Sequence, residues 1–274
     1  MKFSFVALAG ALYASAASAQ APATIDPTTL GPQTFQDTFK TLDAGPDATA
    51  AVQPLHTWRT ILQAPQTPPT ADCCSDSTNT WFGSSGDGLG SPPAYVETAG
   101  LVIAATRQAQ PFGRTWRSQL LNTKFSFSQL YGYFEINAQM PTCVPGTWPA
   151  FWLLPETGVW PLHGEIDAPE IVGAGIAYWT VHSDALGVAT SNTVSSPVSC
   201  TLGFHTYGVL WTANTIAYYV DRKLVGQTPT PGDYTVPMYL LLDLNIGGAW
   251  PGQPSASLTE QKMVVREVDA WSWP

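Results

Sequence analysis

Short runs of β-branched and aromatic residues alternate with glycine- and proline-rich segments along most of the chain. Such runs cover residues 101–107, 131–140, 147–154, 204–211, 215–221, 238–246 and 263–271. Within Tyr131–Met140 the polar residues Glu135 and Asn137 share one parity, while Phe134 and Ile136 share the other. A period of two is typical of β-strands, and no stretch with a helical period exceeds about two turns. The pattern predicts an all-β protein, a sandwich or a barrel without internal repeats.

The composition excludes several classes of protein. Only 11% of the 274 residues are charged, and acids outnumber bases 20 to 11, for a net charge of −9. No basic surplus is available to bind a nucleic acid, and an anionic polysaccharide would be repelled. With 45% hydrophobic and 12% aromatic residues, the chain is too apolar to be disordered. Beyond the N-terminal segment no apolar run reaches the roughly 18 residues that a membrane-spanning helix needs.

The first 19 residues have the three parts of an export signal. Lys2 is the positive start, Phe3–Ala14 is apolar, and Ala17-Ser18-Ala19 is a cleavage site of the A-x-A kind. A short buried helix is the alternative. The segment predicts a secreted or periplasmic protein.

Residues 20–31 are rich in proline and threonine, and we expect a short flexible leader there. The remaining chain, 32–274, has a length that suits one large all-β domain as well as two small ones. We expect a single catalytic domain over this range.

Four cysteines lie in the exported part of the chain, where disulfides can form. They are Cys73, Cys74, Cys143 and Cys200, and four cysteines allow three connectivities. Adjacent Cys73 and Cys74 cannot both bond to distant partners without awkward geometry, which favours Cys143–Cys200. A metal site is less favoured, because no Cys-x-x-Cys or His-x-x-x-His pair accompanies the cysteines.

The densest group of acidic residues lies in His163–Ile171, which reads HGEIDAPEI. Glu165, Asp167 and Glu170 fall within six residues of a chain that has few charges. Tryptophans precede this segment and aliphatic residues follow it, so a solvent-exposed turn is disfavoured. Carboxyl groups in apolar, aromatic surroundings have perturbed pKa values and mark candidate functional sites.

The spacing of the three acids predicts their geometry. Glu165 and Asp167 are two residues apart and share one face of a strand, whereas Glu170 reaches that face only with a β-bulge. Pro169 lies in the required stretch, and proline within strands is largely confined to edges and bulges. A retaining glycosidase needs two such carboxyl groups about 5–5.5 Å apart, one as the nucleophile and one as the acid/base. The same acids could instead bind Ca²⁺, but the segment lacks the alternating Asp, Asn and Gly of a calcium loop.

At these residues the chain resembles the laminarinase-like branch of glycoside hydrolase family 16, whose motif is Glu-x-Asp-x-x-Glu. Further segments match the family in order and spacing: YGYFEINAQMP, GTWPAFWLLP, WPLHGEIDAPEIVG, FHTYGVLW, TIAYYVDRKLV and LNIGGAWPG. The resemblance covers roughly residues 100–273, whereas residues 60–98 match poorly. It implies a concanavalin A-like jelly roll, a β-sandwich of two curved antiparallel sheets with a concave substrate cleft.

The resemblance also implies roles for individual residues. Glu165 would be the nucleophile, Glu170 the general acid/base and Asp167 the assisting acid between them. The expected substrate-binding residues are Trp148, Trp152, His182, Asn245 and Trp250. For each tryptophan the alternative is core packing, and His182 could equally be structural.

Two departures from the family's pattern matter. Ala168-Pro169 stands where the family usually has a long apolar pair, which keeps the count of residues but could shift the bulge. Arg266 stands where many relatives have an aspartate that helps to hold a structural calcium. We therefore expect no cofactor, with a structural calcium as the alternative.

These observations predict an exported endo-glycosidase that hydrolyses a neutral β-linked glucan, with β-1,3 or mixed β-1,3/1,4 linkages, by double displacement. The same residues would serve a transglycosylase that remodels β-glucan or exopolysaccharide, if a sugar intercepts the intermediate. A non-catalytic carbohydrate-binding jelly roll is the third hypothesis, although such a protein has no need of the three acids. We expect a monomer whose partner is the polysaccharide, without nucleic acid or, after signal cleavage, a membrane.

Overall fold

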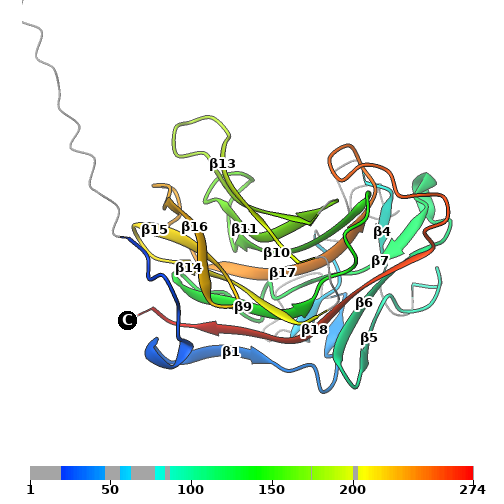
Figure 1. The fold of residues 1–274 in the computed structure, drawn as a ribbon, viewed down its shortest axis with the longest axis horizontal. Helices are drawn as coiled ribbons and strands as arrows, with labels where there is room; N and C mark the ends of the chain where they lie inside the picture. Colours follow the sequence, from blue (N-terminus) through cyan, green and yellow to red (C-terminus); the bar gives the residue numbers. More distant parts are fainter. Residues whose placement is uncertain are drawn as a thin grey trace, which may run out of the picture.

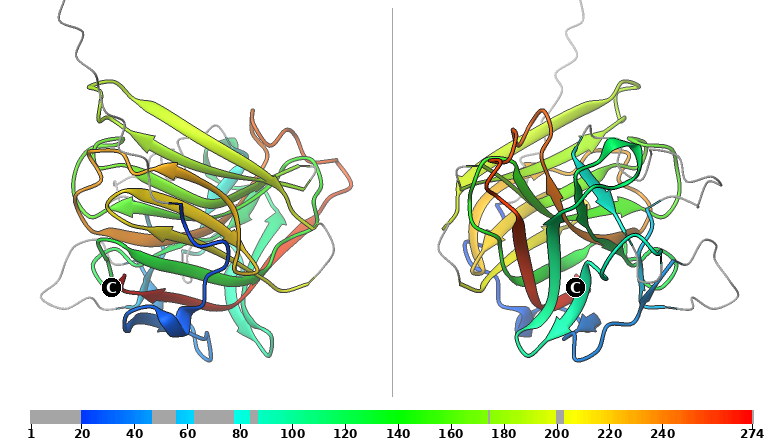
Figure 2. Two further views of the ribbon diagram at one scale, coloured as in Figure 1. Left: turned by 60° about the vertical axis from the view of Figure 1, so that its left-hand side comes forward. Right: turned by 90° about the vertical axis from the view of Figure 1, so that its right-hand side faces the viewer.

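A computed structural model describes residues 20–46, 56–62, 78–83, 87–173, 175–199 and 203–273 of the protein. Two β-sheets lie one on the other in this part of the chain, and both curve in the same direction (Figures 1 and 2). None of the described helices has the length and apolarity that a membrane crossing requires. The expected export signal at residues 1–19 and three of the cysteines, Cys73, Cys74 and Cys200, lie outside the described residues. The Cys143–Cys200 pairing therefore stays a prediction.

The first sheet has the strand order β16-β15-β14-β9-β18-β6-β7-β4, with β1 paired to β18 and β5 to β6. Its strands are β1 (Gln33–Asp37), β4 (Thr80–Phe82), β5 (Ala94–Glu97), β6 (Gly100–Arg107), β7 (Trp116–Ser118), β9 (Gly132–Gln139), β14 (His205–Trp211), β15 (Thr215–Val220), β16 (Lys223–Pro229) and β18 (Glu260–Trp271).

The second sheet has the order β13-β12-β11-β10-β17-β8-β3-β2. Its strands are β2 (Ala44–Gly45), β3 (Trp58–Arg59), β8 (Leu120–Asn122), β10 (Thr147–Pro155), β11 (Glu165–Val172), β12 (Ile176–Ser183), β13 (Thr190–Pro197) and β17 (Met238–Ile246). Two short 3₁₀ helices, η1 (Pro27–Thr29) and η2 (Pro111–Gly113), complete the described elements. The expected jelly-roll sandwich is confirmed, with one correction: the short pairs β2–β3 and β4–β7 are parallel, so the sheets are mixed.

The core lies between the sheets and is built by alternation along each strand. On β9, Phe134, Ile136 and Ala138 enter the core, as the period of two predicted. Two residues of the opposite parity, Tyr133 and Glu135, are also buried, because they lie under other parts of the chain, whereas Asn137 and Gln139 are partly exposed. All the apolar runs singled out in the sequence form strands.

Residues 20–31 do not form the expected flexible leader. Ala21 and Ile25 are buried against Tyr133 and Tyr219 on the outer face of the first sheet. The backbone of this segment also pairs with the β15–β16 hairpin, where Leu224 N–H donates to the Ala23 carbonyl over 2.9 Å. Two apolar side chains and an available strand edge are therefore enough to order a segment of loop-like composition. We call residues 20–31 the N-terminal strap.

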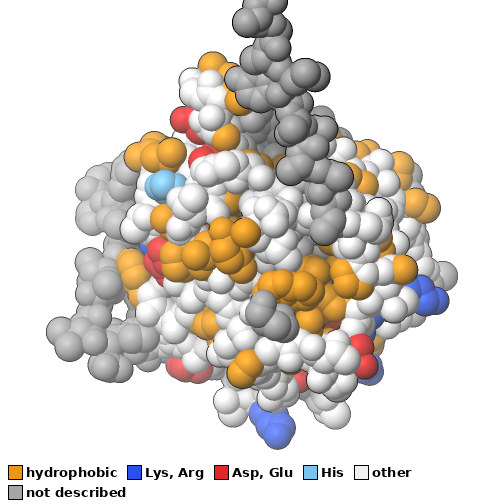
Figure 3. Space-filling view, turned by 90° about the vertical axis from the view of Figure 1, so that its left-hand side faces the viewer, with side chains coloured by type: hydrophobic (Ala, Val, Ile, Leu, Met, Phe, Trp, Pro, Cys, Tyr) orange, Lys and Arg blue, Asp and Glu red, His pale blue; other side chains and the backbone are white. Residues whose placement is uncertain are grey.

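The surface reflects the low charge of the chain. Figure 3 shows one end of the molecule, where hydrophobic side chains gather in several patches and lysine and arginine side chains are few.

At the position where the resemblance places a calcium-holding aspartate, the guanidinium of Arg266 lies 3.5 Å from the ring centroid of Phe204. A stacked cation supplies no oxygen ligand for calcium, so this position does not fit the ion; that the protein needs no calcium stays a prediction.

Candidate active site

A β-bulge interrupts strand β11 at the expected place. Trp152 on β10 pairs with Asp167, but Ala150, two residues earlier, pairs with Glu170, three residues later. The register with β12 shifts by the same single residue between Ile166 and Glu170. The extra residue falls in the Ala168-Pro169 segment, so the departure from the family's apolar pair leaves the bulge in place.

The bulge puts all three acids on the concave face of the second sheet. Their neighbours Ile166, Ala168 and Ile171 point the other way and are buried in the core. If the same residues ran as a regular strand with no bulge, the side chain of Glu170 would share the face of Ile166. The geometry that the spacing predicted for Glu165, Asp167 and Glu170 is therefore confirmed.

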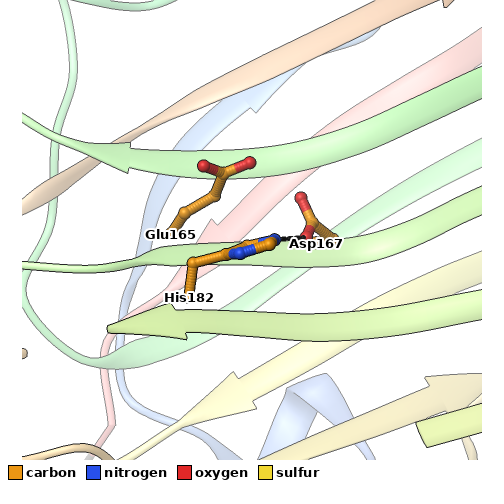
Figure 4. A group of neighbouring side chains, drawn as sticks. All are labelled: Glu165, Asp167 and His182. Atoms are coloured by element: carbon orange, nitrogen blue, oxygen red, sulfur yellow. Dashed lines mark ion pairs between the residues drawn. The ribbon is translucent and has the colours of Figure 1, made fainter. Parts of the chain in front are cut away.

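Glu165, Asp167 and His182 converge at the base of this face. Figure 4 shows the imidazole of His182, on the adjacent strand β12, reaching toward the Asp167 carboxylate. His182 Nε2 lies 3.3 Å from Asp167 Oδ2, and one donor atom from each of the three residues lies within 4.8 Å of the others. Asp167 is only 2% exposed, so His182 partners a carboxylate that water reaches poorly. The set could hold a metal ion, yet its imidazole is already engaged with one of its carboxylates.

Tryptophan N–H groups contact the outer two acids. Trp148 Nε1 donates to Glu170 Oε1 over 3.0 Å, and Trp160 Nε1 donates to Glu165 Oε2. Hydrogen bonds to an ionised carboxylate are stronger than those between neutral groups and orient the carboxylate. Each outer acid therefore has its own indole donor, from a different segment of the chain.

The environment of Glu170 favours its protonated form. Burial raises the pKa of Glu170 well above its ordinary value, and the charges of Asp167 and Glu165 raise it further. The N–H of Trp148 and the imidazole of His182 oppose the rise, but more weakly. A carboxyl group that stays protonated beside ionisable acids is suited to donate a proton as a general acid.

Glu165 and Glu170 line a cleft of about 830 Å³ on the concave face of the second sheet, and Asp167 lies between them along β11. Its lining combines aromatic, hydroxyl and aliphatic side chains: Leu62, Lys124, Trp148, Trp152, Leu154, Trp160, Glu165, Glu170, Tyr178, Thr180, His182, Ser191, Thr193, Tyr239 and Trp250. Trp250 is 47% exposed and packs edge-on against Trp148 and Tyr178. Exposed aromatic faces beside hydroxyl groups suit the apolar faces and polar edges of sugar rings.

Four of the five expected substrate-binding residues line the cleft: Trp148, Trp152, His182 and Trp250. Asn245 differs, because it is only 7% exposed and donates through Nδ2 to Asp243 Oδ2 over 2.9 Å. Asp243 also accepts from Trp152 Nε1 over 2.8 Å. Asn245 thus supports the cleft floor through Asp243 and Trp152; direct contact with substrate stays a prediction for all five residues.

Sequence reasoning missed Tyr234, which lies beneath the acids. This buried hydroxyl lies 2.6 Å from the Glu165 carbonyl and 2.7 Å from the His182 carbonyl. It therefore ties the start of β11 to the end of β12, where the nucleophile candidate and its neighbouring imidazole stand. Tyr234 comes from a loop with no strand pattern, so no signal in the sequence could have placed it there.

A two-layered sandwich with paired carboxyl groups in a sugar-sized cleft defines a protein of the glycosidase class. The family model described as glycosyl hydrolases family 16 matches residues 93–267. The chain therefore belongs to glycosyl hydrolases family 16, as the resemblance of its motifs implied.

Relatives with curated names agree with this assignment. The chain is 36% identical over 249 residues to Endo-1,3-1,4-beta-glycanase EglC of Rhizobium meliloti, covering 88% of this chain and 51% of that protein. It is 32% identical over 208 residues to a Beta-glucanase of Rhodothermus marinus, covering 66% and 72% of the two chains. The X-ray structure of the laminarinase from Rhodothermus marinus superposes with a TM-score of 0.71 at 26% identity, covering 89% and 98%. The chain thus spans about half the length of EglC.

Proposed function

We propose that the protein is an endo-acting glycoside hydrolase that cleaves β-glucans with 1,3 or mixed 1,3/1,4 linkages and retains the anomeric configuration. The observation that carries the proposal is the raised pKa of Glu170, on the same strand face as Glu165, in a cleft lined with aromatic side chains. The names of the relatives, a 1,3-1,4-β-glycanase and a β-glucanase, support the substrate class. Few basic side chains line the cleft, which favours an uncharged glycan.

In the first step, Glu170 gives its proton to the glycosidic oxygen while the carboxylate of Glu165 attacks the anomeric carbon. The bond to the leaving sugar breaks, and a glycosyl-enzyme ester forms on Glu165. In the second step, Glu170 is ionised and takes a proton from water, whose oxygen attacks the anomeric carbon and releases Glu165. Asp167 helps to keep the proton on Glu170 before the first step, since its charge raises the pKa of Glu170. These steps need no cofactor.

We also propose that the protein is exported to the periplasm or the medium, as residues 1–19 predict. A polymeric glucan cannot cross a membrane, so an enzyme of this kind meets its substrate outside the cytoplasm. Expression of the full chain with fractionation of the cells and N-terminal sequencing would test both the location and cleavage after Ala19.

The function is tested by reducing-end release from laminarin, mixed-linkage β-glucan, agarose, xyloglucan and a succinoglycan-type exopolysaccharide. Glu165→Gln is expected to abolish cleavage, whereas Glu97→Gln, an exposed glutamate on β5, is the matched control and should behave as wild type. Proton NMR of the first products should show the β-anomer before mutarotation. If Glu165→Gln cleaved the preferred glucan as fast as wild type, Glu165 would not be the nucleophile and the proposal would fail. Product sizing over time separates hydrolysis from transfer, because transfer yields oligosaccharides longer than the substrate.

A further inference from the structure

The loop between β10 and β11 places an exposed tryptophan over the catalytic centre. Trp160 is 57% exposed, although tryptophan is a residue that folding usually covers. It lines the cleft, and its ring centroid lies 5.7 Å from that of His182. Its indole N–H donates to Oε2 of Glu165. The side chain therefore touches the nucleophile itself and the imidazole that partners Asp167.

The loop is fixed at the end that adjoins β11. His163 Nδ1 lies 3.1 Å from the Asp233 carbonyl, and the Leu162 N–H donates to the Val159 carbonyl over 2.9 Å. Gly164 has a φ of +92°, and a Cβ at this position would lie 2.0 Å from the ring of Tyr234. The backbone between Trp160 and Glu165 thus has a defined course, which sets the direction of the indole N–H.

Other acids lie beside Glu165 in the cleft. Among the described residues, the charged and titratable side chains that line the cleft or face this part of it are Lys124, Asp167, Glu170, Tyr178, His182, Tyr234 and Tyr239. Two of these are acids that repel a charge on Glu165, and the imidazole of His182 lies against Asp167. An N–H donated to a carboxylate favours its ionised form and limits its rotation. The Trp160 N–H supplies both effects directly.

We propose that Trp160 is a positioning residue that keeps the Glu165 carboxylate ionised and aimed into the cleft. It is the counterpart of Trp148 on Glu170, so each reacting carboxyl group has a separate indole donor. The proposal rests on the proposed function for its catalytic consequence, but the hydrogen bond and its effect on Glu165 stand without it.

The test uses Trp160→Phe, which keeps an aromatic ring beside His182 and removes the N–H donor. The expected result is a fall in kcat of about 10- to 100-fold, the range for losing a hydrogen bond to a charged group. KM should change far less. The acidic limb of the kcat/KM profile should move to higher pH, because Glu165 without its donor needs a higher pH to ionise. Trp273→Phe makes the same change at an exposed tryptophan outside the cleft and should leave the profile unchanged.

An activated substrate separates an effect on the nucleophile from an effect on the general acid. A dinitrophenyl β-glucoside oligomer has a leaving group that needs no protonation, so cleavage depends on the nucleophile alone. Trp160→Phe should be slower than wild type on this substrate as well as on polysaccharide. Any loss of rate that Trp148→Phe shows on polysaccharide should largely disappear on this substrate, because Trp148 contacts the general acid. A Trp160→Phe variant that shows only a raised KM, with an unmoved acidic limb, would reduce Trp160 to a sugar-stacking surface.

A readout without substrate makes the result independent of the proposed function. Carbon-13 NMR titration of the glutamate carboxyl groups, with the Glu165 signal assigned from its absence in Glu165→Gln, reports the pKa of Glu165 directly. The pKa should be higher in Trp160→Phe than in wild type, whether or not any glucan is cleaved. An unchanged pKa in a folded Trp160→Phe protein would overturn the proposal.

Discussion

Trp148 donates its indole N–H to Oε1 of Glu170 over 3.0 Å, while burial and the charges of Asp167 and Glu165 raise the pKa of the same carboxyl group. The donor favours the ionised form and so opposes the rise. Trp148→Phe should therefore raise the pKa of Glu170 further. Since Glu170 must be protonated for the first step, the basic limb of the pH profile of kcat/KM should move to higher pH. A limb that stays in place or moves down would show that the bond does not act on Glu170.

Glu170→Gln should remove the general acid of the first step and the general base of the second step. General acid–base catalysis contributes roughly 10²- to 10⁴-fold, and activity on polysaccharide should fall by about that factor. Dinitrophenyl glycosides should still form the glycosyl-enzyme, and added azide should speed its turnover by replacing water as the nucleophile. Equal losses on activated and natural substrates would argue against Glu170 as the proton donor. The exposed Glu97→Gln serves as the control.

Glu170→Gln, which lowers activity, should raise the stability of the fold at neutral pH. The pKa of Glu170 is raised in the folded protein, so its contribution to stability is fully present below the unfolded pKa and is lost as the pH rises through the folded pKa. Glu170→Gln removes this loss, and the variant should be more stable than wild type at neutral pH but not at pH 4. A gain of about 1 kcal/mol would raise Tm by roughly 2–4 °C. Thermal unfolding at several pH values would measure it, and a variant less stable at pH 7 would contradict the expectation.

Tyr234→Phe should weaken the site and the fold together. Removing the hydroxyl leaves the carbonyls of Glu165 and His182 without this buried partner, at a cost of about 1–3 kcal/mol. Denaturant unfolding should show a lower midpoint, and kcat should fall because the start of β11 is less fixed. Tyr95→Phe, on strand β5 and away from the cleft, is a suitable control. Full activity in Tyr234→Phe would show that β11 positions Glu165 without this bond.

Ile25→Ala should lower stability and leave kcat unchanged. Ile25 is 5% exposed in the N-terminal strap and packs on the outer face of the first sheet, on the side opposite the core. Truncation of a buried isoleucine costs about 2–5 kcal/mol. Thr24→Ala changes an exposed neighbour in the same strap and should be neutral. A loss of kcat in Ile25→Ala at a temperature where it is folded would reveal coupling from the strap to the cleft.

The strands and the bulge could be predicted from the sequence because they follow from local pattern. Apolar runs with a period of two identify strands that bury one face, and Pro169 between Asp167 and Glu170 marks the place of an extra residue. Strand β13 could not be predicted in this way. It reads TSNTVSSP and lies at the edge of its sheet, where no buried face imposes an apolar period.

Specific side-chain and backbone contacts account for the features that the sequence did not reveal. The N-terminal strap has a loop-like composition, and it is ordered only by an edge and a tyrosine-rich surface nearly 200 residues away. Asn245 has the parity of a cleft residue, and the sequence did not show that its side-chain amide donates to Asp243; its contact with substrate stays a prediction. The donor role of Trp160 depends on the course of its loop. None of these contacts leaves a periodic mark in the sequence.

The bulge in β11 makes the active centre depend on a count of residues. Deleting one residue between Asp167 and Glu170 would remove the bulge and leave a regular strand, in which the three acids share one face by simple alternation. Inserting one residue beside the existing bulge would instead turn the Glu170 carboxyl group toward the apolar interior and Ile171 toward the cleft. Replacing Ala168 or Pro169 by other small apolar residues would leave both faces as they are. A one-residue insertion in this segment is therefore far more damaging to the site than a small apolar substitution, and a functional library of variants has to avoid lengthening it.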